Sequence, residues 1–260
     1  MSRESSWALS LALLGLLAAC ASVKPADRTQ TIDTDVVVRD HPLTLHVSAL
    51  PRHSPAPFIL YATGDGGWGG SDEDLFDQLA TWGYPAAGFS AHDYVKHLSE
   101  GADALSPEEM AADFGALIQA ALNTLALPAD TGVVLVGKSR GAGLDVAVAG
   151  QDPVRSQLRG IIAIALTREE EYVWVRPKDG RAPAMLLTYP WLPRLGAVPV
   201  AVIQSTHDDY IPAAEARALF GPDTSSRTLR PIESSDHNFG GGVAELYREM
   251  SDCFEWILRQ

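Results

Sequence analysis

The stretch that decides the fold is VVLVGKSRG, residues 133–141. Its first four residues are all apolar, and three of them are β-branched, which predicts a buried strand. Gly137, Ser139 and Gly141 follow in the pattern G-x-S-x-G, and an apolar helical stretch comes next at 141–149. A strand that turns sharply at a serine into a helix is the setting of a nucleophile elbow. The sequence therefore predicts that Ser139 is a catalytic nucleophile.

A second motif overlaps the first and predicts a different chemistry. Residues 132–139, GVVLVGKS, fit the phosphate-loop pattern G-x-x-x-x-G-K-[ST]. A phosphate loop curls its variable residues around the phosphates, whereas here those residues are strand formers. Five extended steps would place Gly132 and Gly137 roughly 16 Å apart, too far to enclose one phosphate. No later strand ends in an aspartate that could position magnesium, so we exclude a nucleotide site.

The surrounding chain alternates strands with helices. We predict strands at 34–39, 43–49, 58–61, 85–89, 133–136, 161–166 and 198–203, and helices at 71–82, 106–127, 141–149, 213–219 and 242–258. The first two strands flank Asp40-His41-Pro42 and predict an antiparallel hairpin. Ser71 and Ser106 are expected to cap their helices. This order predicts an α/β protein with a mostly parallel central sheet, helices on both faces, and a single domain over 32–260.

A nucleophilic serine needs a base, and the base needs an orienting carboxylate. Only His207 and His237 lie beyond Ser139. His237 lies on a loop before the last helix, the usual place of the base, and His207 is expected to be an ordinary loop residue. Asp208 begins a D-x-x-I-P pattern after the strand at 198–203, which predicts the acid, with Asp209 as the alternative.

Acyl transfer also requires donors for the developing oxyanion. One is expected to be the backbone N–H of Arg140, directly after the nucleophile. The others are expected in the loop after the strand at 58–61, which reads TGDGGW at 63–68, with Gly64 and Asp65 as donors. Glycines in this loop let the backbone approach a substrate closely.

Composition restricts the classes of partner. The chain has 260 residues with a net charge of −13, and hydrophobic residues make up 46%. A surface this acidic repels phosphate backbones, so we expect no nucleic acid or nucleotide partner. The acidic runs at 72–74 and 169–171 are expected to be solvated surface. We find no pattern for a metal or an organic cofactor.

The first residues predict export and lipidation. An apolar run at 7–19 has the length of a signal-peptide core and ends at Cys20, in the pattern of a bacterial lipobox. We expect a signal peptide at 1–19, lipidation of Cys20, and a lipidated tether at 20–31. Ala21 is compatible with the outer membrane, on the periplasmic side of the envelope. The other cysteine, Cys253, is expected to be a buried structural thiol.

Together, ATGDGGW at 62–68, the helix at 106–127 and VVLVGKSRGAG at 133–143 resemble the VirJ/AcvB family of bacterial virulence proteins. EYVWV at 171–175 and DHNFGGG at 236–242 fall where that family has comparable segments. The resemblance implies an α/β-hydrolase fold, a periplasmic location, and hydrolysis of aminoacyl-phosphatidylglycerol, a membrane lipid.

The resemblance assigns Ser139, Asp208 and His237 as the triad and 64–66 as the oxyanion loop. Two positions depart from the family: Lys138 replaces a usual tyrosine, and SDHNF at 235–239 replaces GGHHF. Both flank the reacting centre and bear on substrate choice. The substrate-binding residues are expected to be Gly66, Trp68 and Lys138, with Lys138 and Arg140 as alternative contacts for a lipid phosphate.

The function expected from these features is that of a serine ester hydrolase acting on lysyl- or alanyl-phosphatidylglycerol. Two alternatives remain at this stage. One is the same triad acting on another lipid or a small ester, and the other is a non-catalytic partner protein of the envelope or a secretion apparatus.

Overall fold

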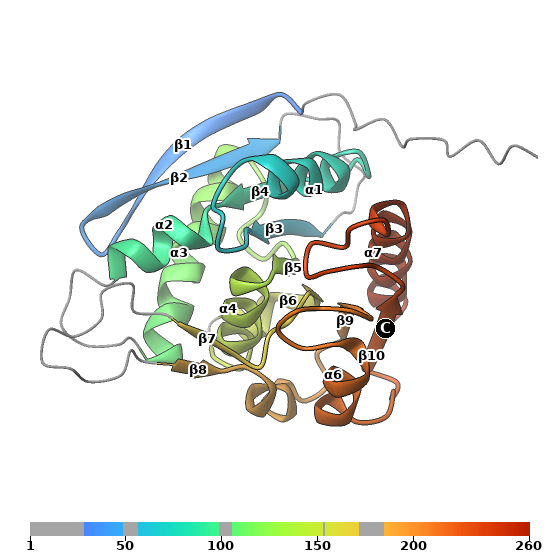
Figure 1. The fold of residues 1–260 in the computed structure, drawn as a ribbon. Coiled ribbons are helices and arrows are strands. Elements are labelled where there is room, and N and C mark those ends of the chain that lie inside the picture. The colour runs from blue at the N-terminus through green and yellow to red at the C-terminus, as the bar shows by residue number, and fades with distance from the viewer. Residues whose placement is uncertain (1–28, 49–56, 99–105, 153, 172–184) are drawn as a thin grey trace, which may run out of the picture.

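The computed structural model describes residues 29–48, 57–98, 106–152, 154–171 and 185–260. Eight strands form one sheet in the spatial order β1-β2-β4-β3-β5-β6-β9-β10 (Figure 1). Both β1–β2 and β2–β4 pair antiparallel, and every later neighbour pairs parallel. The mostly parallel sheet is therefore confirmed. The expected signal peptide and Cys20 lie outside the described residues.

The strands of this sheet are β1 Thr31–Val38, β2 His41–Ser48, β3 Phe58–Ala62, β4 Ala86–Phe89, β5 Val133–Lys138, β6 Leu158–Ile164, β9 Val200–Ser205 and β10 Arg227–Ile232. A separate antiparallel pair consists of β7 Glu169–Glu171 and β8 Met185–Leu187. The helices are α1 Gly70–Ala80, α2 Ala91–Leu98, α3 Pro107–Thr124, α4 Arg140–Ala149, α5 Val154–Gln157, α6 Ala213–Phe220 and α7 Val243–Leu258. A 3-10 helix covers Tyr189–Leu195.

Two hydrophobic clusters lie on the two faces of the sheet. One contains Phe114 of α3, Leu144 of α4 and Phe220 of α6. The other contains Phe76 of α1 and Phe254 of α7. Because helices cover both faces, the central strands are apolar throughout instead of alternating, as a buried parallel sheet requires.

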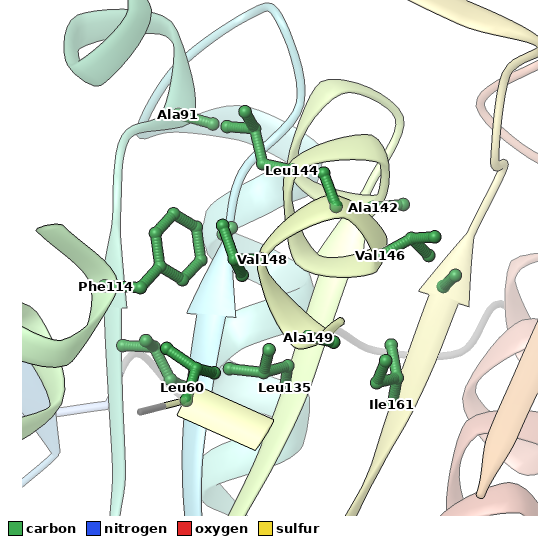
Figure 2. Packing of buried hydrophobic residues seen from close by; sticks show 14 of the residues in the cluster. Leu60, Ala91, Phe114, Leu135, Ala142, Leu144, Val146, Val148, Ala149 and Ile161 are labelled. Atoms are coloured by element: carbon green, nitrogen blue, oxygen red, sulfur yellow. The ribbon is translucent and has the colours of Figure 1, made fainter. Parts of the chain in front are cut away.

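Helix α4 is the centre of the larger cluster. All of its residues are buried. Figure 2 shows Leu144 directed toward Ala91, and Val148 directed toward Phe114 on the side of the sheet where Leu135 lies. A helix that packs on every side cannot shift without opening the core, because protein interiors are close-packed. The turn that precedes α4 is fixed by the same packing.

Several features differ from the sequence-based expectation, which included neither β10 nor α2. Strand β10 contains Pro231 and two arginines, and it forms because an edge strand tolerates a residue that cannot donate a hydrogen bond on its open side. Helix α2 follows Ser90, whose Oγ accepts from the N–H of Asp93 at 3.1 Å. Helix α1 has Gly69 as its N-cap residue without a side-chain cap, so Ser71 does not cap it. The expected capping box of Ser106 with Glu109 is present.

Candidate active site

The candidate residues gather at one edge of the sheet. Ser139 directly follows β5, Asp208 follows β9, His237 follows β10, and Asp65 follows β3. These four strands are parallel, so their carboxyl ends meet at the same edge, where ligands of open α/β sheets bind. Segments far apart in the sequence are thus placed around one point.

The turn at Ser139 has the geometry of a strained elbow. Ser139 adopts φ 51° and ψ −114°, a backbone conformation that side-chain-bearing residues rarely adopt. A Cβ on Gly137 would lie 2.4 Å from the carbonyl carbon of Gly141, and one on Gly141 would lie 2.2 Å from the Ala62 oxygen. Both positions therefore require glycine. The Ser139 N–H donates to Ile164 O at 2.8 Å, which ties the turn to β6.

Ser139, His237 and Asp208 form a hydrogen-bonded chain. His237 Nε2 lies 2.9 Å from Ser139 Oγ, and His237 Nδ1 lies 2.7 Å from Asp208 Oδ2. Because a carboxylate accepts, Nδ1 carries the proton, which leaves Nε2 of neutral His237 to accept from the serine hydroxyl. The side chain of Asp208 is 0% exposed and that of His237 is 10% exposed, so the hydrogen bond between them is largely shielded from water.

Four hydrogen bonds hold the Asp208 carboxylate. Its Oδ2 also accepts from Gln204 Nε2 at 2.9 Å, and its Oδ1 accepts from the N–H groups of Tyr210 at 2.8 Å and Ile211 at 3.1 Å. Asp209, the alternative acid, is exposed. These donors stabilise a buried charge that would otherwise be costly.

The two histidines of the sequence analysis have different surroundings. The His207 side chain is 65% exposed, and its Nδ1 lies 3.1 Å from Ser234 O. The exposed Tyr210 ring meets the His237 ring edge-on at 4.7 Å between centroids. Only His237 contacts the serine.

The loop that carries His237 is organised by one of the residues that depart from the family pattern. Asp236 Oδ1 accepts from the N–H groups of Asn238 at 2.8 Å and Gly240 at 3.1 Å. The hydrogen bond from Ser235, followed by the one from Gly240, lowers the pKa of Asp236. The SDHNF sequence therefore forms its own turn around His237.

In the oxyanion loop, the prediction that Gly64 is an oxyanion donor is wrong. The N–H of Gly64 donates to Asp72 Oδ1 at 2.7 Å, so Gly64 is not available as an oxyanion donor. The N–H groups of Asp65 and Arg140 have no protein acceptor among the described residues. A Cβ on Gly64 would lie 3.7 Å from Ser139 Cβ, so the loop lies directly against the serine. Two N–H groups next to the serine are thus unpaired.

The expected substrate contacts of Lys138 are also corrected. Lys138 is 5% exposed, and its Nζ lies 3.2 Å from Asp72 Oδ2 and 3.0 Å from Ser71 Oγ. The Asp72 carboxylate therefore neutralises the charge of the buried Lys138, which is not available to bind a lipid phosphate. The Arg140 guanidinium is likewise paired, with Asp65 Oδ1 at 2.9 Å.

Trp68 fills a packing position. Its ring stacks on His46 at 3.9 Å between centroids and lies 5.1 Å from Phe76. A Cβ on Gly88 would come within 2.6 Å of the indole, so Trp68 packs over β4. The indole is half-buried, and its role in substrate binding stays a prediction. Gly66 is exposed beside Asp65, and its role in binding stays a prediction.

Two carboxyl groups at this edge were expected to be solvated and are buried. Asp72 is 5% exposed and Glu170 is 8% exposed. Burial raises the pKa of Glu170, while the hydrogen bond from Thr167 and the charge of Arg140 oppose that rise. Helical spacing could have identified Asp72, because it lies three and four residues before the buried Leu75 and Phe76.

The remaining predictions concern the Cys253 thiol, metal ligands and membrane-spanning helices. Cys253 is 1% exposed, and burial raises the pKa of its thiol to about 12, in agreement with a structural role. Within the described ranges, no three His, Cys, Asp or Glu side chains are grouped so as to hold a metal ion. In the same ranges, no helix has the length and apolar character needed to cross a bilayer.

The fold is that of the α/β serine hydrolases. Est1E from Butyrivibrio proteoclasticus has a TM-score of 0.61 at 13% identity, over 88% of this chain and 99% of that one. XC6422 from Xanthomonas campestris, an α/β serine hydrolase without a lid, has a TM-score of 0.56 at 14% identity, over 89% and 97%. A membrane phospholipase A, described as a bacterial virulence factor, has a TM-score of 0.60 at 12% identity, over 88% and 87%.

Within that fold class, residues 57–182 match the model of the VirJ bacterial virulence protein family. The match includes the TGDGGW loop and the elbow, which confirms the family resemblance inferred from these segments. Among curated protein sequences, none matches the chain.

Proposed function

We propose that the chain is a serine ester hydrolase that uses Ser139, His237 and Asp208 as its catalytic triad. The observation that carries this proposal is the continuous hydrogen-bonded chain from Ser139 Oγ through the His237 ring to Asp208. Its order and its positions after β5, β9 and β10 match the roles of nucleophile, base and acid.

The reaction follows from this arrangement. His237 Nε2 takes the proton as Ser139 Oγ attacks the ester carbonyl, and the N–H groups of Asp65 and Arg140 donate to the resulting oxyanion. Collapse of the intermediate expels the alcohol, which receives the proton from His237. Water then attacks the acyl-enzyme with His237 again as base, and releases the acid while regenerating Ser139.

We further propose that the substrate is the aminoacyl ester of aminoacyl-phosphatidylglycerol, with a lysyl or alanyl group. The resemblance to the VirJ/AcvB family implies this substrate class, and residues 57–182 match the VirJ family model. The charge of the molecule also supports this substrate class, because a net charge of −13 favours a cationic aminoacyl group. Arg140 and Lys138 next to the serine are each paired with a carboxylate, so neither repels such a group as a free cation would.

The location that fits this substrate is the periplasmic side of the envelope. We propose that Cys20 is lipidated and that the tether at 20–31 holds the enzyme at the bilayer, with the outer membrane favoured. A covalent anchor would overcome the repulsion between an acidic protein and anionic lipid.

The test uses the protein at 21–260 and its Ser139→Ala variant, each incubated with lysyl- and alanyl-phosphatidylglycerol. We expect free amino acid from the first and none from the second. A fluorophosphonate that labels Ser139 separates the alternatives. Labelling without amino acid release would indicate another ester substrate, and absence of labelling would indicate a non-catalytic partner protein.

A further inference from the structure

We propose that the ion pair between Arg140 and Asp65 is a positioning device for the oxyanion hole. The same two residues supply the two unpaired N–H groups beside Ser139, so their side chains join the donors to each other. The proposal rests on the serine hydrolase function above, and it assigns Arg140 and Asp65 a second role through their side chains.

The contact is direct and partly shielded from water. Arg140 Nε and Nη2 each lie 2.9 Å from Asp65 Oδ1. The Arg140 side chain is 8% exposed, whereas that of Asp65 is 58% exposed. A third nitrogen, Arg140 Nη1, donates to the backbone oxygen of Glu171. The guanidinium therefore links the elbow to the oxyanion loop on one side and to β7 on the other.

Neighbouring hydrogen bonds hold the oxyanion loop around the unpaired N–H of Asp65. The preceding N–H, on Gly64, donates to Asp72 Oδ1 at 2.7 Å. The carbonyl after it, on Asp65, accepts from His92 Nδ1 at 2.8 Å. With the side chain of Asp65 fixed by Arg140, the Asp65 N–H is left between three anchored groups. These contacts, on the residue before it and on Asp65 itself, restrict the direction in which the N–H points.

Such an arrangement matters because an oxyanion hole works only when it is organised in advance. Donors must lie within about 0.5 Å of their productive positions. An isolated exposed ion pair contributes little stability. The pair between Arg140 and Asp65 instead fixes the position of the Asp65 N–H relative to the elbow. The elbow leads into a close-packed helix, whereas Asp65 lies on a separate, glycine-rich loop.

The experiment compares Asp65→Ala, Arg140→Ala and the double variant, all of which keep both backbone N–H groups. The substrates are an ester and the corresponding thionoester, whose sulfur accepts hydrogen bonds poorly. An intact oxyanion hole favours the ester, so the ratio of the two rates reports the hole. The ratio is measured on one sample, so a partly unfolded fraction cancels. Arg248→Ala, which breaks an exposed ion pair with Glu245 on α7, is the matched control.

We expect each single substitution to lower kcat for the ester about 10- to 100-fold, with KM changed less than about threefold. The ester-to-thionoester ratio should fall in parallel. The double variant should lose no more than about threefold in kcat beyond the less active single variant, because either substitution already breaks the contact between the two side chains. Asp65→Asn, which keeps an acceptor oxygen, should recover part of kcat, and Arg248→Ala should match the parent.

The proposal is overturned if kcat falls while the rate ratio stays at its parent value, or if the two single losses multiply in the double variant. An unchanged kcat in both single variants overturns it as well. These results would leave the triad intact. If the parent protein hydrolyses neither substrate and Ser139 is not labelled by fluorophosphonate, the proposed function fails and the positioning role fails with it.

Discussion

The ammonium of Lys138 lies 3.2 Å from the carboxylate of Asp72, and the two side chains are only 6% and 7% exposed. Asp72 also accepts from Tyr61 Oη at 2.9 Å and from the Gly64 N–H at 2.7 Å. A single buried carboxylate thus joins the residue before the nucleophile to the oxyanion loop.

Removing the cation of this pair should destabilise the fold. In Lys138→Met, the Asp72 carboxylate stays buried without its counter-charge, and we expect the free energy of unfolding to fall by about 3 to 5 kcal/mol. Denaturant unfolding measures the change. Arg155→Met, which removes the cation of an exposed pair with Asp152, should cost less than about 1 kcal/mol. Equal losses in the two variants would contradict the role of burial.

The two histidines beyond the serine provide a matched pair for the base. His237→Ala should lower kcat by about 10⁴-fold or more, because within the described part of the chain only His237 contacts Ser139 Oγ as a base. His207→Ala changes an exposed side chain and should leave kcat within about twofold of the parent. Steady-state hydrolysis of an activated ester measures both. A large loss in His207→Ala alone would refute the assignment.

Neighbouring aspartates provide the same comparison for the acid. Asp208→Asn keeps the shape but presents an amide to His237 Nδ1, which favours the wrong tautomer, and kcat should fall by about 10⁴-fold. Asp209→Asn alters an exposed carboxyl and should have no comparable effect. The pair is compared by kcat at one pH, with binding of a reversible inhibitor to confirm folding. Equal activity of the two variants would remove Asp208 from the triad.

Asp145 on α4 predicts a pH-dependent stability. Both of its carboxyl oxygens are buried without a hydrogen-bond partner among the described residues, and burial raises its pKa well above the ordinary value of 3.8. Below that value the carboxyl is neutral in both the folded and the unfolded state, so it adds no pH dependence to the stability. As pH rises above it, the unfolded chain ionises first, so stability falls until pH passes the folded pKa.

Asp145→Asn removes this ionisation and should be more stable than the parent at pH 7. The difference should vanish at about pH 3, where both states of Asp145 are protonated. Denaturant unfolding from pH 3 to 7 measures it, with Asp209→Asn as an exposed control. A difference that does not depend on pH would show that the effect comes from packing instead of ionisation.

Cys253 should resist thiol reagents in the folded protein. Burial raises its pKa to about 12, so very little thiolate is present at pH 8. We expect the 21–260 protein, which lacks Cys20, to react with iodoacetamide only after denaturation. Mass spectrometry measures the labelled fraction. Rapid labelling of the native protein would place Cys253 at an accessible position.

The sequence was sufficient for seven of the eight strands of the central sheet and for the elbow, because both depend on local patterns. The apolar run at 133–136 and the two glycines after it allow one backbone path. The placement of His237 next to Ser139 could be expected from chain order, but the hydrogen bonds between them required the folded sheet. Strand β10 escaped prediction because its edge position, not its composition, allows it to form.

The partners of Lys138 and Arg140 could not be predicted from sequence. Each pairs with a carboxylate more than 60 residues away in the sequence, and only the fold brings the two segments together. Adjacent charges in the sequence suggested solvated runs, whereas Asp72 and Glu170 point inward. The fold also pairs the Gly64 N–H with Asp72, so this N–H cannot donate to an oxyanion. A sequence motif does not indicate such a partner.

These long-range pairs have a consequence for protein engineering and for divergence among relatives. The two glycines of the elbow allow no replacement, while the residues at 138 and 140 can change only together with their counterparts at 72 and 65. Substitutions among relatives should therefore covary across the two segments. A graft of the elbow into another scaffold would need residues 64–72 as well as 137–141, because either piece alone would carry charges without counterions.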